Sequence, residues 1–512
     1  MPHPLLTADA VTLEYRDRTV LEEIDLTLHE RERVALVGAN GSGKTTLLRV
    51  LAGALSPTTG RIHRPGSGQL YLPQAGGPAP SRSVRDVIAD LVGVGPAERQ
   101  MDALAARLAG GDLDVIEPHT AAVERWSGLG GADFHARLGP ALERLGLDRD
   151  RADRDYATLS GGEAARTRLA ALGLTRTDVV LLDEPSNHLD RSGQDLLLAL
   201  LGELDAAVVL ASHDRSLLEA TATRVVELDR CRAESFGGGW SAYLRERESR
   251  RALARRRYDE AVAERNRLVK LRQGLSEQAR VGQRRAERSG ETDKFVRHMA
   301  IESAQKNTAA SGLERRIELA EIPEKPWRED LSRLLLDAGQ EVHSPAVVQL
   351  AAVSVRRGDW QLGPLDLTVA PGERILLTGP NGSGKSTVVG LMSGRLAPDS
   401  GEVRRPQGAR ILELAQSRDP LGAGSGGWAG DPAGTDGEVS VAARFRQVSG
   451  LSKTAARTAL AAMRIPAGRV ELSPDQLSPG EATRVELALL AVRKAACLIL
   501  DEPSNHLDIE AL

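Results

Sequence analysis

Two stretches of this chain have the residues and spacing that can hold a phosphate chain. Residues 38–45 read Gly-Ala-Asn-Gly-Ser-Gly-Lys-Thr and residues 379–386 read Gly-Pro-Asn-Gly-Ser-Gly-Lys-Ser, each after an apolar run. In a turn between a strand and a helix, such glycines let backbone N–H groups surround phosphate oxygens, while the lysine supplies a charge and the final hydroxyl can ligate Mg²⁺. For either stretch alone, a glycine-rich turn in an ordinary α/β unit is the alternative. We expect nucleotide binding by two sets of residues: Gly38, Asn40, Gly41, Ser42, Gly43, Lys44, Thr45 and Thr46, and Gly379, Asn381, Gly382, Ser383, Gly384, Lys385, Ser386 and Thr387.

Paired carboxylates follow an apolar run in each half of the chain. Residues 179–184 read Val-Val-Leu-Leu-Asp-Glu and residues 498–502 read Leu-Ile-Leu-Asp-Glu. At the end of a buried strand, the aspartate suits Mg²⁺ and the glutamate can orient and deprotonate a water that attacks a γ-phosphate. A histidine after a further apolar run at 208–211 is expected to contact that phosphate, although such a histidine is more often a loop residue. We expect catalysis by Glu184, His213 and Glu502, and metal binding by Asp183, Asp501, Thr45 and Ser386.

A serine and glycines that open a helix form a second phosphate-binding device. Residues 159–163 read Leu-Ser-Gly-Gly-Glu and residues 477–481 read Leu-Ser-Pro-Gly-Glu. The serine hydroxyl and the free N–H groups of a helix N-terminus can both bind phosphate. The expected binding residues are Ser160, Gly161 and Gly162 in the first copy, and Ser478 and Gly480 in the second. There Pro479 removes one N–H donor.

The spacing of these motifs indicates a tandem duplication. The interval from Ser160 to Asp183 is identical to the interval from Ser478 to Asp501. A glutamine also recurs after each phosphate loop, and the intervals from the loop lysine to Gln74 and to Gln416 differ by a single position. Agreement of spacing across several motifs is the mark of an internal repeat.

These motifs, in one order and present twice, resemble those of ATP-binding-cassette proteins over most of residues 1–240 and 345–512. Two such units without a membrane segment, joined by a charged helical linker, are similar to the ABC-F subfamily, ATPases that act on ribosomes. The pair Asn187 and His188 also resembles that subfamily. The resemblance implies an α/β fold with two P-loop cassettes, each a mixed sheet with helices and a helical subdomain, joined by a long α-helical hairpin. The implied domains are a first cassette at 1–240, the hairpin linker at 241–330 and a second cassette at 345–512.

The resemblance also implies ATP and Mg²⁺ as ligands and an internal pseudo-dimer of the cassettes. Gln74 and Gln416 would reach toward Mg²⁺ and the attacking water. Each site would combine the phosphate loop of one cassette with the serine and glycines of the other, so that Lys44 would face Ser478 and Lys385 would face Ser160. Asp190 and Asp508 would lie along the seam.

An aromatic residue in each half is a candidate platform for adenine. Tyr15 lies in the alternating run 11–15 and can either stack on adenine or be an ordinary half-buried strand residue. The corresponding position of the second half is Arg356, where Trp360 nearby can substitute.

Residues 84–158 read as helices and form the expected helical subdomain, in which any projecting arm should be short or absent.

Residues 241–320 differ in charge from the rest of the chain: they hold 20 lysine and arginine residues against 12 acidic ones, in a chain of net charge −4. Two helical runs, to residue 287 and from residue 294, predict an antiparallel hairpin. A solvated charged linker is the alternative to RNA phosphate contact. The candidate RNA-contact residues near the hairpin tip are Arg280, Arg284, Arg285 and Arg288.

Composition places the chain among globular proteins, with 41% hydrophobic and 27% charged residues. Neither a signal peptide nor an apolar run of about 18 residues is present, which indicates a cytoplasmic protein. The two cysteines, Cys231 and Cys497, do not suggest a disulfide or metal framework. Because Leu512 follows Glu502 closely and no second histidine strand appears, we expect this chain to be a fragment of a longer protein.

The predicted function is an ABC-F ATPase whose ATP-closed form binds the ribosome and whose hydrolysis releases it. By resemblance, the linker reaches 23S-type rRNA near the peptidyl-transferase region and tRNA, in translation control or in ribosome protection against antibiotics. The alternative is the fused ATPase subunit of a separate membrane transporter.

Overall fold

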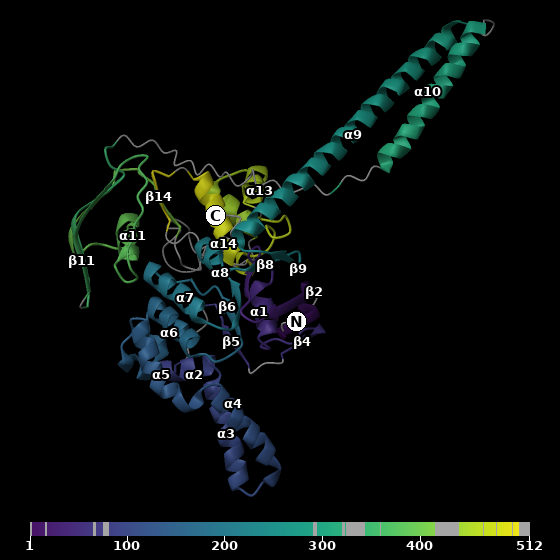
Figure 1. Ribbon diagram of the computed structural model, residues 1–512. Coiled ribbons are helices and arrows are strands. Elements are labelled where there is room, and N and C mark those ends of the chain that lie inside the picture. The colour runs from purple at the N-terminus through teal and green to yellow at the C-terminus, as the bar shows by residue number, and fades with distance from the viewer. Residues whose placement is uncertain are drawn as a thin grey trace. The chain divides into compact units, whose positions relative to one another are not determined.

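The computed structural model describes residues 3–15, 18–64, 68–74, 81–289, 294–319, 323, 344–358, 360–414, 440–463, 465–477, 479–493 and 495–500. The chain divides into two compact units (Figure 1). One comprises Met1–Trp240 with Leu331–Leu512, and the other comprises Ser241–Asp330. The first unit contains both phosphate loops. No described helix is long and apolar enough to cross a membrane.

The first cassette is built on a six-stranded sheet of order β5-β6-β7-β3-β8-β9. Its strands are β3 (Arg33–Val37), β5 (Gln69–Leu72), β6 (Val179–Asp183), β7 (Ala207–Ala211), β8 (Arg224–Asp229) and β9 (Arg232–Gly237). All neighbours are parallel except the antiparallel pair β8 and β9. Every residue of β6 and β7 is buried, as expected of central parallel strands covered on both faces. Because the strands are parallel, the carboxyl ends of β3, β6 and β7 meet at one edge, where the predicted site residues lie.

A second, antiparallel sheet of order β2-β1-β4 completes the core of this cassette. Its strands are β1 (Pro4–Tyr15), β2 (Arg18–His29) and β4 (Thr59–His63). One apolar cluster joins β1 and β2 to helix α1 (Lys44–Leu51) and to one face of the six-stranded sheet. Leu47, Leu48, Val50 and Leu51 of α1 are all buried there. The helix that begins at the phosphate-loop lysine is therefore held inside the core.

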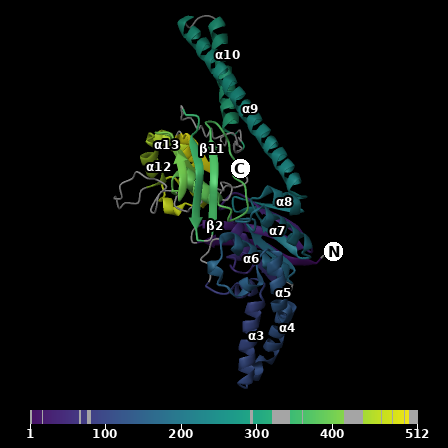
Figure 2. The ribbon, with the colours of Figure 1, turned by 90° about the vertical axis from the view of Figure 1, so that its left-hand side faces the viewer.

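The helices of the first cassette carry the second phosphate-binding device. They are α2 (Val84–Leu91), α3 (Val94–Ala109), α4 (Ile116–Gly128), α5 (Gly131–Arg144), α6 (Gly161–Leu174), α7 (Arg191–Glu203) and α8 (Arg215–Thr221). Helices α3 and α4 pack together as a short hairpin that extends away from α2 and α6 (Figure 2). Helix α6 begins at the predicted Ser-Gly-Gly motif.

The second cassette repeats part of this plan. Strands β10 (Val348–Arg357), β11 (Trp360–Val369) and β12 (Ser400–Arg404) form an antiparallel sheet, and β13 (Ile411–Leu414) pairs in parallel with β14 (Cys497–Leu500). Its helices are α11 (Lys385–Ser393), α12 (Val441–Ser449), α13 (Lys453–Ala462) and α14 (Pro479–Val492).

One apolar run of the second cassette does not form a strand. Residues 375–378 precede the second phosphate loop as β3 precedes the first, but they are outside any strand, and Leu376 is 84% exposed. In the first cassette β3 pairs with β7 and β8. The described part of the second cassette contains no counterpart of those two strands, and within that part the run pairs with no strand.

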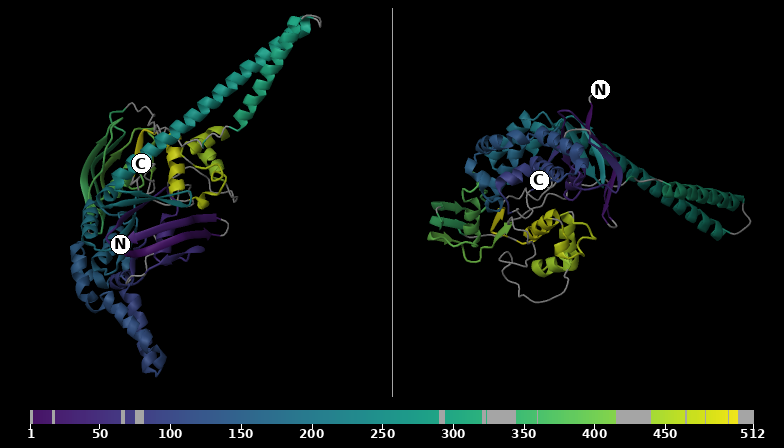
Figure 3. Two further views of the ribbon diagram at one scale, coloured as in Figure 1. Left: turned by 45° about the vertical axis from the view of Figure 1, so that its right-hand side comes forward. Right: turned by 90° about the horizontal axis from the view of Figure 1, so that it is seen from below.

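The second unit is a helical hairpin of α9 (Trp240–Ser289) and α10 (Lys294–Glu318). The two helices lie side by side in antiparallel directions (Figure 3). Arg272 of α9 pairs with Glu314 of α10 at 2.8 Å, and the small side chains of Ala279, Ser303 and Ala310 are buried. Small buried residues let two helices approach closely, so the hairpin predicted from the sequence is present.

Candidate nucleotide-binding and hydrolysis sites

The first phosphate loop connects β3 to α1 in a conformation that needs its glycines. Gly38 and Gly43 have φ angles of 150° and 107°, and a Cβ atom on Gly38 would lie 2.4 Å from the carbonyl oxygen of Leu228. The side chain of Lys44 is buried, and its Nζ donates to the carbonyl oxygens of Gly38 at 2.8 Å and Ala39 at 3.2 Å. The loop thus curls over its own lysine at the N-terminus of α1, which is the geometry that binds phosphate.

The second phosphate loop has the same conformation although no strand precedes it. Gly379 and Gly384 have φ angles of 156° and 98°, and Lys385 Nζ donates to the carbonyl oxygens of Gly379 and Pro380 at 2.8 and 2.9 Å. Helix α11 begins at Lys385 as α1 begins at Lys44. A preceding strand is therefore not needed for this loop conformation.

A set of oxygen ligands suited to Mg²⁺ gathers at the end of β6. Burial raises the pKa of Asp183, while the Thr45 hydroxyl, the positive charges of Lys44 and Arg49 and the Gln74 N–H act against this rise. The Asp183 Oδ2 atom is buried and has no hydrogen-bond donor among the described residues. An unsatisfied buried carboxylate oxygen beside a hydroxyl fits a hard cation, which prefers oxygen ligands. Thr45, Gln74 and Asp183 are brought together here as expected.

The next residue, Glu184, is a buried carboxylate that lies beside His213. Burial and the charge of Asp183 raise its pKa to about 7, although Lys44 and the His213 N–H act in the opposite direction. Its backbone has a φ of 48°, an uncommon conformation for a residue with a side chain. The backbone N–H of His213 donates to Glu184 Oε2 at 3.3 Å, and the His213 Nε2 lies 3.3 Å from Oε1. A carboxylate whose pKa lies near neutrality can accept a proton from water at the operating pH.

The Ser-Gly-Gly motif of the first cassette begins α6 as predicted. The Ser160 hydroxyl accepts a hydrogen bond from the Glu163 N–H at 3.3 Å, and the Glu163 carboxylate accepts one from the Ser160 N–H at 2.9 Å. This capping box leaves the N–H groups of Gly161 and Gly162 at the open end of the helix.

These residues share a cleft of about 640 Å³ with the second phosphate loop. The cleft is lined by Ser160, Gly161, Gly162, Arg166 and His188 together with Arg357, Trp360, Asn381, Gly382, Gly384, Lys385, Ser386 and Thr387, among others. The Asn381 N–H donates to Asp190 at 3.2 Å, and its side chain donates to the carbonyl oxygen of His188 at 2.8 Å. The structure therefore brings Lys385 and Ser160 to one cleft, the arrangement that the sequence predicts for the second site.

Comparison with known proteins agrees with this geometry. A family model described as ABC transporter matches residues 21–187 and 362–505. The chain is 32% identical over 99% of its length to "Tylosin resistance ATP-binding protein TlrC" of Streptomyces fradiae, covering 90% of that protein. It is 28% identical over 96% of its length to "Probable ATP-binding protein YheS" of Escherichia coli (71% of that protein covered). It is 27% identical over 99% of its length to "Energy-dependent translational throttle protein EttA" of Mycobacterium tuberculosis (85% covered).

The chain belongs to the ABC-F group of ATP-binding-cassette proteins. As an ABC-F protein it binds ATP and hydrolyses it to ADP and phosphate.

For several predicted residues the structure shows neither a place in the cleft nor a contact with nucleotide-binding residues. Gln416, Ser478, Asp501, Glu502 and Asp508 fall outside the described residues. Gly480 is buried in α14. Tyr15, the candidate adenine platform of the first site, is 49% exposed, and Trp360, the candidate of the second site, lines the cleft described above. On the hairpin, Arg280 and Arg284 are exposed on α9, and the side chains of Arg285 and Arg288 fall outside the described ones.

Sequence reasoning missed Arg166, which lines the cleft and pairs with Asp190 at 3.2 Å. It follows Ser160 by six positions, so it lies on the same helix, less than two turns from the motif. This spacing is the sequence signal that could have placed Arg166 near Ser160. Its pairing with Asp190 could not be predicted in this way, because the two residues are far apart along the chain.

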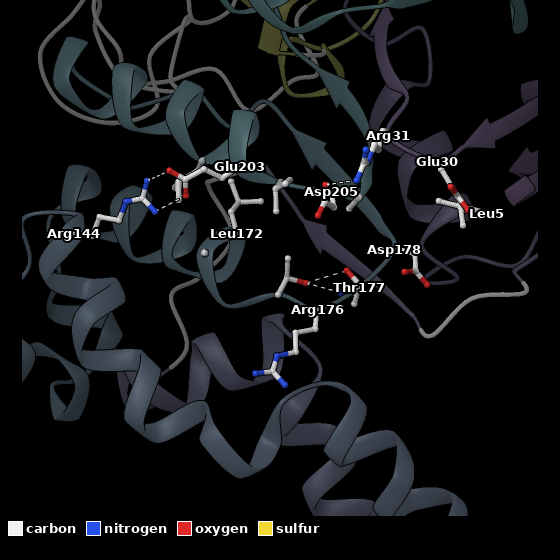
Figure 4. Close-up of a pocket in the computed structure, with 15 residues that line it drawn as sticks. Leu5, Glu30, Arg31, Arg144, Leu172, Arg176, Thr177, Asp178, Glu203 and Asp205 are labelled. Atoms are coloured by element: carbon white, nitrogen blue, oxygen red, sulfur yellow. Dashed lines mark hydrogen bonds and ion pairs between the residues drawn. The ribbon is translucent and has the colours of Figure 1, made fainter. Parts of the chain in front are cut away.

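A second cavity, of about 550 Å³, lies at the amino ends of β3, β6 and β7 (Figure 4). Three arginines line it: Arg31 is paired with Asp205, Arg144 with Glu203, and Arg176 with Asp133. Since carboxylates already neutralise these cations, we assign no nucleotide binding to this cavity.

Proposed function

We propose that this ABC-F ATPase acts on the ribosome, which its ATP-bound form binds and its hydrolysis releases. The α9–α10 hairpin is the proposed effector and contacts rRNA near the peptidyl-transferase region and tRNA. The proteins named for tylosin resistance and for translational throttling, each matched over 99% of this chain, are the observation that carries the proposal.

The hairpin supports a nucleic-acid partner. Residues 241–320 carry 20 basic and 12 acidic residues, in a chain of net charge −4. Arg280 and Arg284 are exposed one helical turn apart on α9. Exposed cations in a row on one helix can bind successive phosphates of a nucleic acid, in a manner that weakens with salt.

The proposed chemistry is in-line attack of water on the γ-phosphate of ATP. Lys44 and the N–H groups of the phosphate loop hold the phosphates, and Glu184 orients the water and accepts its proton. His213, beside Glu184, contacts the γ-phosphate. Thr45 and Asp183, with Gln74 beside them, would hold Mg²⁺, which would neutralise charge on the phosphates. In the second site, Lys385 and Ser386 work with Ser160 and Gly162.

Co-sedimentation with ribosomes tests the proposal. The Glu184→Gln variant should pellet with ribosomes in the presence of ATP and remain soluble without it, because its first site binds nucleotide but does not turn it over. If this variant stays soluble under both conditions, ribosome action is excluded and the role of a transporter ATPase gains support.

A second measurement separates the two ribosomal roles. Expression of the protein in a tylosin-sensitive host should raise the inhibitory concentration of tylosin if it protects ribosomes. If it is a translation factor, adding it to a drug-free translation reaction in vitro should instead change the rate of translation. The size of that change should depend on the ATP-to-ADP ratio.

A further inference from the structure

One peptide unit of the first cassette is bonded at its carbonyl oxygen and directs its N–H toward a carboxylate. Arg168 of α6 donates from Nη1 to the carbonyl oxygen of Pro73 at 3.0 Å. The N–H of the same peptide belongs to Gln74, and it donates toward the carboxylate of Asp183. Because a peptide is planar, fixing its oxygen also fixes the direction of its N–H. Pro73 further restricts this segment, since its ring fixes φ.

The chain after Gln74 is attached to the same region. Where residues 81–84 lead into α2, the Val84 N–H donates to the carbonyl oxygen of Arg154 at 2.9 Å, and the Tyr156 N–H donates to that of Arg82 at 2.9 Å. Ser81 also donates to Asp155 at 3.0 Å. The described residues on the two sides of positions 75–80, namely Pro73 and residues 81–84, are thus bonded to residues 154–168, the segment that contains Ser160.

We propose that Arg168 is a positioning residue for ATP hydrolysis, which fixes the peptide that carries Gln74 and so links the Ser160 motif to the hydrolysis site of the first cassette. The inference rests on the proposed role of Gln74 at that site and is independent of ribosome binding. Ser160 stands at the N-terminus of α6 and Arg168 lies on the same helix, so a shift of α6 is transmitted to the peptide of Gln74. The nucleotide cleft of the second site thereby influences the geometry of the first.

The two cassettes differ at this position. Arg168 follows Ser160 by eight positions, and the residue eight positions after Ser478 is Glu486. A carboxylate cannot donate to a carbonyl oxygen in the same way. The link is therefore a property of the first cassette, and the two sites should hydrolyse ATP at different rates.

The test uses the full chain without ribosomes and compares Arg168→Gln, Arg168→Lys and Gln74→Ala. The readouts are kcat, KM for ATP and the Mg²⁺ concentration that gives half-maximal activity. Arg137→Gln is the matched control, because Arg137 also donates from α5 to a carbonyl oxygen of α6, that of Leu174 at 3.1 Å, but lies away from Gln74. Binding of a fluorescent ATP analogue reports whether each variant is folded.

We expect Arg168→Gln to lower kcat about tenfold and to raise the Mg²⁺ concentration that gives half-maximal activity. KM for ATP should change less than about twofold. This pattern is the one expected when a residue that supports a metal ligand is removed. Arg168→Lys, which keeps one donor, should fall between wild type and Arg168→Gln and remains informative if Arg168→Gln does not fold. The double variant of Arg168→Gln and Gln74→Ala should be no slower than Gln74→Ala alone.

Three results would overturn the inference: wild-type kcat in Arg168→Gln, an equal loss in Arg137→Gln, or additive losses in the double variant. An unaltered Gln74→Ala variant would remove the proposed role of Gln74 itself.

Discussion

The Nε2 atom of His213 lies 3.3 Å from Oε1 of Glu184, at the carboxyl ends of two adjacent buried strands. The pairing joins the residue after β6 to the second residue after β7, and the backbone N–H of His213 donates to the same carboxylate. The fold therefore holds the imidazole against the proposed base.

ATPase activity should rise with pH through about 7. Burial raises the pKa of Glu184 to about 7, so the carboxylate form that accepts a proton is the minor form at pH 6 and the major form at pH 8. The measurement is kcat/KM against pH, which reports groups of the free enzyme. Asp214 also raises this pKa, so Asp214→Asn should move the midpoint to lower pH. A flat profile between pH 6 and 8 would contradict this assignment.

Glu184→Gln should stabilise the protein at pH 8 and much less at pH 5. In the unfolded chain this carboxyl has its ordinary pKa of 4.5, and folding raises the pKa to about 7. The folded state therefore binds the proton more tightly, and stability falls as pH rises from about 4.5 through 7. Removing the carboxyl should recover about 1–3 kcal/mol at pH 8, measured by urea unfolding. Glu117→Gln, an exposed site at the start of α4, is the control, and an equal gain at both pH values would refute the explanation.

Gly38→Ala should abolish ATP binding at the first site. The added Cβ would lie 2.4 Å from the Leu228 carbonyl oxygen at a backbone φ of 150°, so the loop must move away from its phosphate-binding shape. Gly202→Ala is the matched control: it lies in α7, where a Cβ meets nothing within 4 Å. That variant should bind ATP normally and gain up to about 1 kcal/mol of stability. Nucleotide titration of both variants decides the matter; equal affinities would show that the loop tolerates a side chain.

Asp190→Ala should destabilise the first cassette by about 1 kcal/mol, the usual value of a helix N-cap. The Asp190 carboxylate accepts hydrogen bonds from the Gly193 N–H at 2.9 Å and from Ser192 at 2.8 Å. Burial acts to raise the pKa of Asp190. The opposite effect is larger: these two bonds, a third from the Asn381 N–H and the charge of Arg166 lower the pKa to about 2. The contribution of the Asp190 carboxylate to folding stability is present above pH 3.8, the pKa of an ordinary aspartate, and is lost as pH falls toward 2. Asp190→Asn keeps the cap and should lose less in thermal unfolding; equal losses would show that the charge dominates.

Replacing Arg280 and Arg284 together by glutamate should weaken ribosome binding without changing the basal ATPase. Both side chains are exposed on α9, and each phosphate contact removed reduces the dependence of binding on salt. Arg245→Glu, an exposed position near the start of α9, controls for charge. Pelleting assays at several salt concentrations measure the effect. Unchanged binding would place the contact surface elsewhere on the protein.

The phosphate loops, Asp183, Glu184 and Ser160 could be identified from the sequence because each belongs to a short motif whose local conformation is set by its own residues. Gly379 and Gly384 keep that conformation even where the preceding residues form no strand. Arg166 and Arg168 could not be assigned, because their partners Asp190 and Pro73 are brought to them only by folding.

The second cassette contains a run whose structure could not be predicted from its sequence pattern. Its apolar run at 375–378 resembles the run that forms β3, yet it is exposed and outside any strand. A strand forms only where neighbouring strands are available for pairing, and sequence periodicity does not report whether these are present. The helical hairpin, in contrast, followed from composition, since charged residues with high helix propensity dominate both runs.

Helix α9 runs without interruption through 50 residues, beginning shortly after the last strand of the six-stranded sheet. At a rise of about 1.5 Å per residue it is about 75 Å long, so that turning its first residues by only about 5° displaces its far end by roughly 6 Å. A rotation of this size at the first turn of α9 is therefore enough to move its distal end by about the width of a nucleotide base.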